Sequence, residues 1–225
     1  MGPLPTTTPQ GNKFILIMTD AFSNFIVASP TKDTSAVATL DAFMKDWVAN
    51  FGLPDSIHTD RGTNFESRLM SMVCAQFGIR KTRTSAHHPM SNGLCERAVG
   101  QVKRTLRLHV ATWPNQWDRS LHFCLMTLRS GIHTRTGISP ARLFLGREMR
   151  TIGDVITNVN TEKLAGDQRP YAERLLTDVH KIQELTRKKI EISKIKQKSV
   201  YDRSAYSENL KVGSKVIKRI IHPYG

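Results

Sequence analysis

The chain begins with two short apolar runs separated by a polar turn. Residues 14–20 read FILIMTD and residues 24–30 read NFIVASP. Both are rich in residues that favour strands, so they predict two neighbouring strands. SIHT at 56–59 predicts a short strand that ends at Asp60, and RKTRTS at 80–85 predicts a polar or edge strand.

Apolar positions spaced three or four residues apart lie between these strands and predict helices. The first helix begins at Thr34 or Ser35 and ends at Gly52 and Pro54. Its expected core stripe consists of Val37, Leu40, Met44, Trp47 and Phe51. The second helix ends at Gly78, and its expected stripe consists of Leu69, Val73 and Phe77.

Helical patterns continue through the second half of the chain. One predicted helix covers residues 94–110. A second has an apolar stripe of Trp117, Leu121, Leu125 and Leu128, and a third, short helix covers residues 139–146 with Ser139 as its cap. Residues 168–203 predict a long basic amphipathic helix, and residues 210–221 predict a turn and a strand. The apolar face expected for the long helix contains Tyr171, Leu175, Val179 and Ile182. This order of strands and helices predicts an α/β layer fold.

The net charge of the chain indicates what kind of partner it binds. The 225 residues are 39% hydrophobic, enough for a packed core, yet the net charge is +14 and the pI is near 10.1. Such a chain usually binds a polyanion, most often nucleic acid, although a merely basic surface is the alternative. Residues 161–225 contain 15 Lys and Arg against 8 Asp and Glu, the denser part of this charge. We therefore expect a core at 1–160, a basic helical linker at 161–209 and the start of a small β-barrel at 210–225.

Cysteine spacing and hydropathy point to the compartment. Cys74, Cys95 and Cys124 have no CxxC spacing and resemble the reduced cysteines of an intracellular protein. The sequence shows neither a signal peptide nor an apolar run long enough for a membrane span. We expect no membrane partner.

Asp60 and Glu96 are the candidate catalytic and metal-binding residues. Thirty-five residues separate them; Asp60 ends a predicted strand, and Glu96 lies on a predicted helix after a Gly/Pro/Ser/Asn loop. Two carboxylates presented in this way suit a hard divalent cation such as Mg²⁺ or Mn²⁺. The alternative for either residue is a solvated surface group or a helix cap.

Polar and basic residues around these carboxylates are candidates for binding DNA. On a helical wheel Lys103 and Arg107 lie within about 40° of Glu96, whereas Ala98, Val102 and Leu106 are spaced to face the core. The other candidates are Asn64, His87, Ser91 and Asn92. An ordinary basic helix face and a plain connecting loop are the alternatives.

Several motifs in order resemble the integrase catalytic core of gypsy-type LTR retrotransposons and retroviruses. They are GPLP (2–5), FILIMTDAFSNF (14–25), FGLPDSIHTDRGTNFES (51–67), FGIRKTRTSAHHPMSNGLCER (77–97) and TGISPARLFLGRE (136–148). The resemblance implies an RNase H-like mixed sheet flanked by helices and a D,D-35-E metal site. It also implies that element DNA ends are processed and joined to a target by multimers on DNA, in the nucleus.

The sequence departs from this family at its first catalytic Asp. The resemblance places that residue three positions before Gly2, so we expect it upstream of Met1 and expect the chain alone to be inactive. Asp20 matches a family Asp that is not a metal ligand, so we do not expect it to substitute for the missing residue. A non-catalytic or domesticated DNA-binding relic and an RNase H-type nuclease remain as alternative functions.

Overall fold

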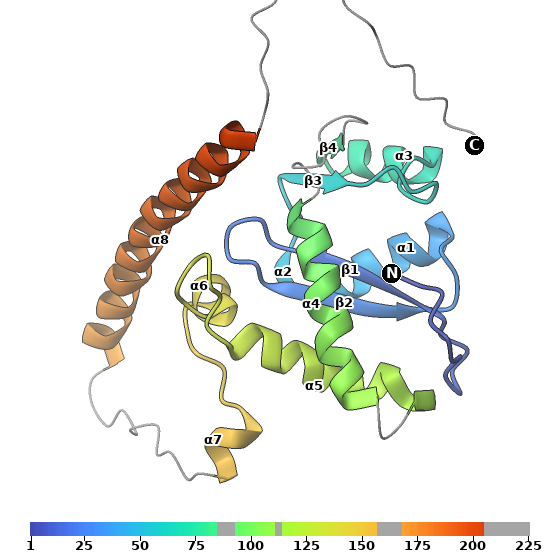
Figure 1. Ribbon diagram of the computed structural model, residues 1–225, viewed down its shortest axis with the longest axis horizontal. Helices are drawn as coiled ribbons and strands as arrows, with labels where there is room; N and C mark the ends of the chain where they lie inside the picture. The colour runs from blue at the N-terminus through green and yellow to red at the C-terminus, as the bar shows by residue number, and fades with distance from the viewer. Residues whose placement is uncertain (85–92, 111–113, 157–167, 205–225) are drawn as a thin grey trace, which may run out of the picture.

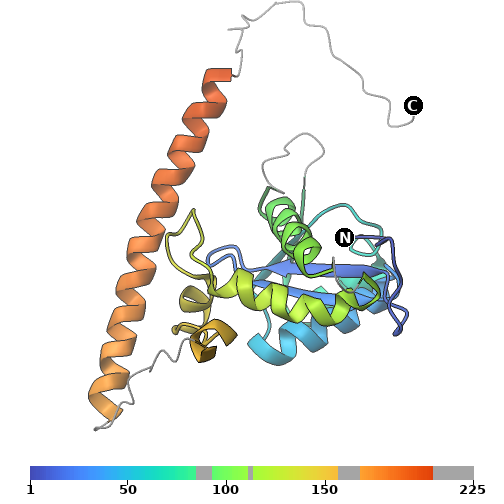
Figure 2. The same cartoon turned by 60° about the horizontal axis from the view of Figure 1, so that its bottom comes forward.

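The computed structural model describes residues 1–84, 93–110, 114–156 and 168–204. Its described part is a mixed α/β layer structure in which helices cover both faces of a central hairpin (Figures 1 and 2). The long helix α8 stands beside this body, next to α6. None of the described helices is long and apolar enough to cross a membrane. The expected strand at 210–221, and with it the start of a β-barrel, lies outside the described residues.

The central hairpin consists of β1 (Phe14–Thr19) and β2 (Ile26–Thr31), which pair antiparallel as the two apolar runs predicted. Their side chains alternate between two faces. Ile15 and Ile17 contribute to one hydrophobic cluster, whereas Met18 packs against two others. The hairpin is therefore covered on both sides, which explains why its sequence reads as continuous apolar runs.

The remaining two strands form a separate sheet. β3 (Ser56–Thr59) and β4 (Arg80–Arg83) are parallel and are connected through α3 (Arg68–Gln76). The expected single mixed sheet is thus divided, among the described residues, into two sheets of two strands. The edge of β1 opposite β2 bonds to Met1 instead: the Met1 amino group donates to the Ile15 carbonyl at 2.8 Å, and the Ile15 N–H donates to the Met1 carbonyl at 2.9 Å.

Two helices cover the first face of the hairpin. α4 (Gly93–Val110) and α5 (Trp117–Ser130) pack against each other and on β1 and β2. A one-turn 3₁₀ helix, η3 (Pro114–Gln116), leads into α5. The core here comprises Ile15, Ile26, Ala98, Val102, Leu106, Trp117, Leu121, Cys124 and Leu125. The expected inward face of α4 is confirmed.

The opposite face is covered by α1 (Ala36–Phe43), which continues through the π-helical η1 (Met44–Val48) into α2 (Ala49–Phe51). Ser35 caps the helix through its hydroxyl, and Gly52, at φ 83°, follows its last residue. The predicted stripe was wrong at Val37, whose surface is 57% exposed. Phe43 takes the core position together with Leu40.

The predicted stripe of α3 was wrong at Leu69 and Phe77, whereas Val73 is partly buried and packs against the core as expected. Leu69 and Phe77 are each 41% exposed, whereas Met70 and Cys74 are buried. One residue corresponds to a rotation of about 100° around the helix. Met70 and Cys74 pack in the same cluster as Leu40 and Phe43 of α1, so tertiary packing decided which of two adjacent apolar stripes faces inward.

Three helices complete the described chain. α6 (Pro140–Leu145) is capped by Ser139 as expected, α7 (Ile152–Ile156) is short, and α8 (Gln168–Ser204) is the predicted long basic helix. α8 contacts α6, and its Thr186 and Ile190 are buried. Of its expected apolar face, Ile182 is half-buried, and the side chains of Tyr171, Leu175 and Val179 lie outside the described part.

Candidate metal and nucleic-acid site

Asp60 follows the last residue of β3 and is exposed. Its Oδ1 accepts a hydrogen bond from the Gly62 N–H at 2.9 Å, and within the described chain Oδ2 has no protein hydrogen-bond partner. A Cβ at Gly62 would lie 2.7 Å from Asn64 Oδ1 and 3.0 Å from Asp60 Oδ1. A side chain at this position would displace the Asn64 and Asp60 side chains, so glycine leaves room for the Asp60 carboxylate to bond to its own turn.

Glu96 lies in the first turn of α4 and is also exposed. The positive end of the helix dipole favours a carboxylate at this place. Because Ala98 and Val102 are buried against the hairpin, α4 is locked with Glu96, Lys103 and Arg107 directed to solvent. The predicted stripe of one acid and two cations is therefore present on the exposed face.

The two carboxylates act on the same thiol. The pKa of Cys95, which is half-buried, is raised first by burial and then by the negative charges of Asp60 and Glu96. Repulsion by Asp60 places the end of β3 within electrostatic reach of the first turn of α4, which contains Cys95. Glu96 directly follows Cys95 in the chain, so only the effect of Asp60 reports on the fold, and a metal ion shared by the two carboxylates stays a prediction.

The amino group of Met1 lies within electrostatic reach of Asp60. Burial lowers the pKa of its amino group, while the negative charge of Asp60 acts in the opposite direction. Met1 is held there by its two hydrogen bonds with Ile15.

The described residues contain no group of three or more His, Cys, Asp and Glu side chains that could hold a metal ion. Asp60 and Glu96 supply a hard, all-oxygen donor set that fits Mg²⁺ in type but not in number of protein ligands.

Asp20 has a structural role in the turn between β1 and β2. Its Oδ2 accepts hydrogen bonds from the Phe22 N–H at 3.2 Å and from the Ser23 N–H and hydroxyl at 2.7 Å each. This carboxylate therefore stabilises the turn between β1 and β2. Asp20 is explained by local structure.

The predicted DNA-binding residues are distributed unevenly. Lys103 and Arg107 are exposed on α4. Asn64 donates through Nδ2 to the Thr39 hydroxyl at 2.9 Å, which ties the loop after Asp60 to α1. His87, Ser91 and Asn92 lie outside the described residues.

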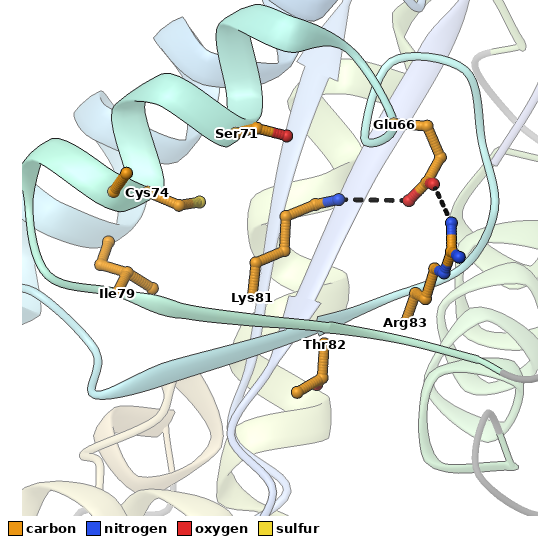
Figure 3. Close-up of a pocket in the computed structure, with 8 residues that line it drawn as sticks. Glu66, Ser71, Cys74, Ile79, Lys81, Thr82 and Arg83 are labelled. Atoms are coloured by element: carbon orange, nitrogen blue, oxygen red, sulfur yellow. Dashed lines mark hydrogen bonds and ion pairs between the residues drawn. The ribbon is translucent and has the colours of Figure 1, made fainter.

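A shallow groove of about 450 Å³ lies between α3 and β4 (Figure 3). Its prominent charged group is Glu66, which binds Lys81 at 3.1 Å and Arg83 at 2.7 Å. These two cations hold the pKa of Glu66 below its usual value. Glu66 pairs with both cations but neutralises only one of their two positive charges, so the groove keeps a net charge of +1 and both basic side chains are held by this carboxylate.

A second basic group was not recognised in the sequence. Arg97 on α4 lies close enough to Arg135, in the loop before α6, to lower the pKa of that guanidinium together with burial. His133 lies with them, and its pKa is lowered by burial and by both arginines. The signal was the segment HTRTG at 133–137, whereas the family motif recognised in the sequence begins only at Thr136.

Comparison with known proteins agrees with this architecture. The family model "Integrase core domain" matches residues 2–89. The chain is 24% identical over 222 residues to the Retrovirus-related Pol polyprotein from transposon 412 of Drosophila melanogaster, covering 97% of this chain and 18% of that protein. It is 29% identical over 137 residues to the Gag-Pol polyprotein of Gibbon ape leukemia virus, covering 60% of this chain and 8% of that protein.

A solved structure shows the same fold. The HTLV-2 integrase catalytic core domain in complex with magnesium, in its trimeric form, superposes with a TM-score of 0.50 at 24% identity, covering 58% of this chain and 83% of that one. The chain spans less than a fifth of the length of the two polyproteins described above. Residues 2–89 are thus similar to the integrase core domain, the chain resembles retroviral and transposon Pol polyproteins in sequence, and its fold is the RNase H-like fold of an integrase catalytic core.

Proposed function

We propose that this chain is the core of a retrotransposon integrase, a metal-dependent polynucleotidyl transferase that processes element DNA ends and joins them to target DNA. The observation that carries the proposal is that the negative charge of Asp60 reaches Cys95, the residue that precedes Glu96 on α4. The homologous domain and the net charge of +14 support the reaction and the polyanionic substrate. Chromosomal DNA as the target would place the protein in the nucleus.

Asp60 and Glu96 would hold Mg²⁺, or Mn²⁺ in its place. When bound, divalent ions activate the attacking oxygen and stabilise the leaving oxygen in phosphoryl transfer. The chain itself contributes rigidity and charge. The Gly62 turn fixes Asp60, the buried face of α4 fixes Glu96, and Lys103 and Arg107 offer cations to the phosphates of a bound strand.

A third carboxylate would complete the ligand set. The family resemblance puts it three positions before Gly2, and two structural observations support that place. Residues 1–4 run antiparallel to β1 on its outer edge, since the Leu4 N–H also donates to the Lys13 carbonyl at 2.8 Å. Met1 lies within electrostatic reach of Asp60. We propose that a strand continuing through Met1 carries this ligand, and that residues 1–225 alone do not join DNA ends.

The decisive experiment is a strand-transfer assay with labelled DNA ends and Mg²⁺ or Mn²⁺. We expect no transfer by residues 1–225 and activity from a chain that continues upstream with Asp three positions before Gly2. Glu96→Gln should abolish that activity, and Asp55→Asn, at the other end of β3, should keep it. Transfer by residues 1–225 that is lost on Asp20→Asn would refute the assignment of the first ligand.

One alternative has an observation in its favour. The described residues hold two candidate carboxylates and not three, so a non-catalytic DNA-binding role is consistent with the same geometry. An extended chain that binds DNA but neither joins nor cuts it would support that alternative. Hydrolysis without joining would instead indicate a nuclease.

The trimeric form of the HTLV-2 core supports an oligomer as the active form of this chain. Light scattering with DNA bound would measure its oligomeric state.

A further inference from the structure

A small pocket lies between the turn of the central hairpin and the start of α4. It has a volume of about 10 Å³, room for one atom the size of a water oxygen. We call it the Asn24 pocket. The polar residues that line it are Thr19, Asn24, Arg97, Gln101 and His133.

Asn24 is the most informative of these residues. It is only 6% exposed, and its Nδ2 is buried with no hydrogen-bond partner. An unpaired buried amide donor costs about 1–3 kcal/mol, so an acceptor is expected opposite it. The backbone of Asn24 has φ 61°, a left-handed conformation that Asn and Asp tolerate better than most residues. The turn therefore holds an open donor at the wall of a polar pocket.

Two arginines beside this pocket have no carboxylate partner among the described residues. Arg97 folds back over the start of α4, since a Cβ at Gly93 would lie 3.2 Å from its Nη1. Arg135 donates to the Ala21 carbonyl at 3.1 Å, but its Nε is buried without a partner. Within the described parts of the chain, neither arginine forms an ion pair with a carboxylate.

Arg129, a nearby arginine, has a partner for its Nε and a ring beside its guanidinium. Arg129 is also partly buried, but its Nε donates to the Ile26 carbonyl at 2.8 Å and its guanidinium lies 4.5 Å from the centre of the Phe25 ring. Arg135 has no such arrangement for its Nε. The guanidinium groups of Arg97 and Arg135 are near enough to repel each other, and an anion beside them would reduce that cost.

His133 adds a neutral donor. Its Nδ1 accepts from the Arg135 N–H at 3.3 Å, which leaves the proton of the neutral ring on Nε2. Burial and the two arginines lower the pKa of His133, so the ring is neutral at physiological pH. The pocket is thus lined by hydrogen-bond donors with positive charge beside them.

We propose that the Asn24 pocket binds a single oxygen of a DNA backbone phosphate. The volume admits one oxygen and not a whole phosphate, so the rest of the group must remain outside, as it does in a polynucleotide strand. The choice of DNA rests on the proposed function, whereas the anion preference rests on the pocket alone. Since Arg97 directly follows Glu96, the bound phosphate would anchor a strand beside the candidate metal ligands.

α8 extends this anchor. Arg187 lies 5.9 Å from the centre of the Phe22 ring, in the same hairpin turn as Asn24. The side chain of Lys189 lies against Gly137 in the loop that carries His133 and Arg135. A strand leaving the Asn24 pocket toward α8 would meet these cations, which links the core to the basic helix through one bound strand.

Thermal unfolding of the full chain tests the anion site without DNA. Inorganic phosphate should raise the Tm above that in chloride at equal ionic strength and pH. Asn24→Asp keeps the side-chain shape but supplies a carboxylate within the pocket. This variant should have a higher Tm in chloride and lose the response to phosphate, and Arg135→Gln should lose the response too. Gln10→Glu, the same change of charge on an exposed turn, should respond like the parent chain.

A phosphate response that is unchanged in Asn24→Asp and in Arg135→Gln would overturn the proposal. The DNA part is tested by duplex binding between low and physiological salt. Each of the two variants should reduce the slope of log affinity against log salt by about 1 relative to Gln10→Glu. A lost phosphate response with an unchanged slope would overturn DNA as the ligand. Neither experiment measures end joining, so failure of the proposed activity is distinguishable from failure of the pocket.

Discussion

At the scale of single residues, Cys95 is a natural reporter of the candidate metal site. Its thiol pKa is raised by burial and by the charges of Asp60 and Glu96. A cation held by these carboxylates would cancel their repulsion of the thiolate, lower the pKa and increase the thiolate fraction at a fixed pH. We therefore expect Mg²⁺ to accelerate alkylation of Cys95 at neutral pH.

Two other cysteines provide internal controls for that labelling experiment. Cys124 is buried and its pKa is raised to about 11, and burial also raises the pKa of Cys74. Neither pKa depends on Asp60 or Glu96, so alkylation of both thiols should be slow and insensitive to Mg²⁺. Glu96→Gln should speed alkylation of Cys95 without metal and weaken the metal response. An equal effect of Mg²⁺ on all three thiols would contradict a local site.

At the scale of elements, α5 is the centre of the first core. Leu121 is fully buried against α4 and the hairpin. Leu121→Ala should lower the free energy of unfolding by about 2–5 kcal/mol, because it removes buried methyl groups and leaves a cavity. Leu108→Ala on α4, whose side chain is 77% exposed, should change it by less than about 0.5 kcal/mol. Urea unfolding of both variants measures the difference, and similar losses would show that the core is placed wrongly.

The same helix pair offers a test of the DNA-binding face. Lys103 lies on the exposed side of α4, whereas Lys45 lies on η1, on the other side of the hairpin. Lys103→Glu should weaken binding to any DNA sequence, since phosphate contacts carry no sequence information. Lys45→Glu makes the same change in net charge and should weaken binding less. Equal losses in a fluorescence anisotropy titration would indicate a diffuse charge effect without a defined face.

The elements were predictable where their periodicity was strong. The strands at β1, β2 and β3, the cap at Ser35 and the inward face of α4 followed directly from the sequence. The buried stripe of α3 did not, because Leu69 and Met70 begin two equally apolar stripes and only packing against α1 selects the second. The Asn24 pocket could not be predicted either, since it joins residues from a turn, a helix and a distant loop.

At the scale of the whole molecule, the net charge of +14 predicts strongly salt-dependent binding to DNA. Each neutralised phosphate contributes about 0.9 to the slope of log affinity against log salt. We expect affinity to fall steeply between low and physiological salt and to depend little on sequence. Affinity that is unchanged over this range would show that the basic faces of α4 and α8 do not contact the backbone.

The central claim is that Asp60 and Glu96 share one divalent ion, and a Mn²⁺ titration by calorimetry tests it most directly. The parent chain should bind Mn²⁺ at one site, and Asp60→Asn and Glu96→Gln should each abolish that site because either change removes a ligand. Asp55→Asn, an exposed carboxylate just before β3, should leave binding unchanged. Binding that survives both ligand substitutions, or is lost only with Asp55→Asn, would contradict the claim.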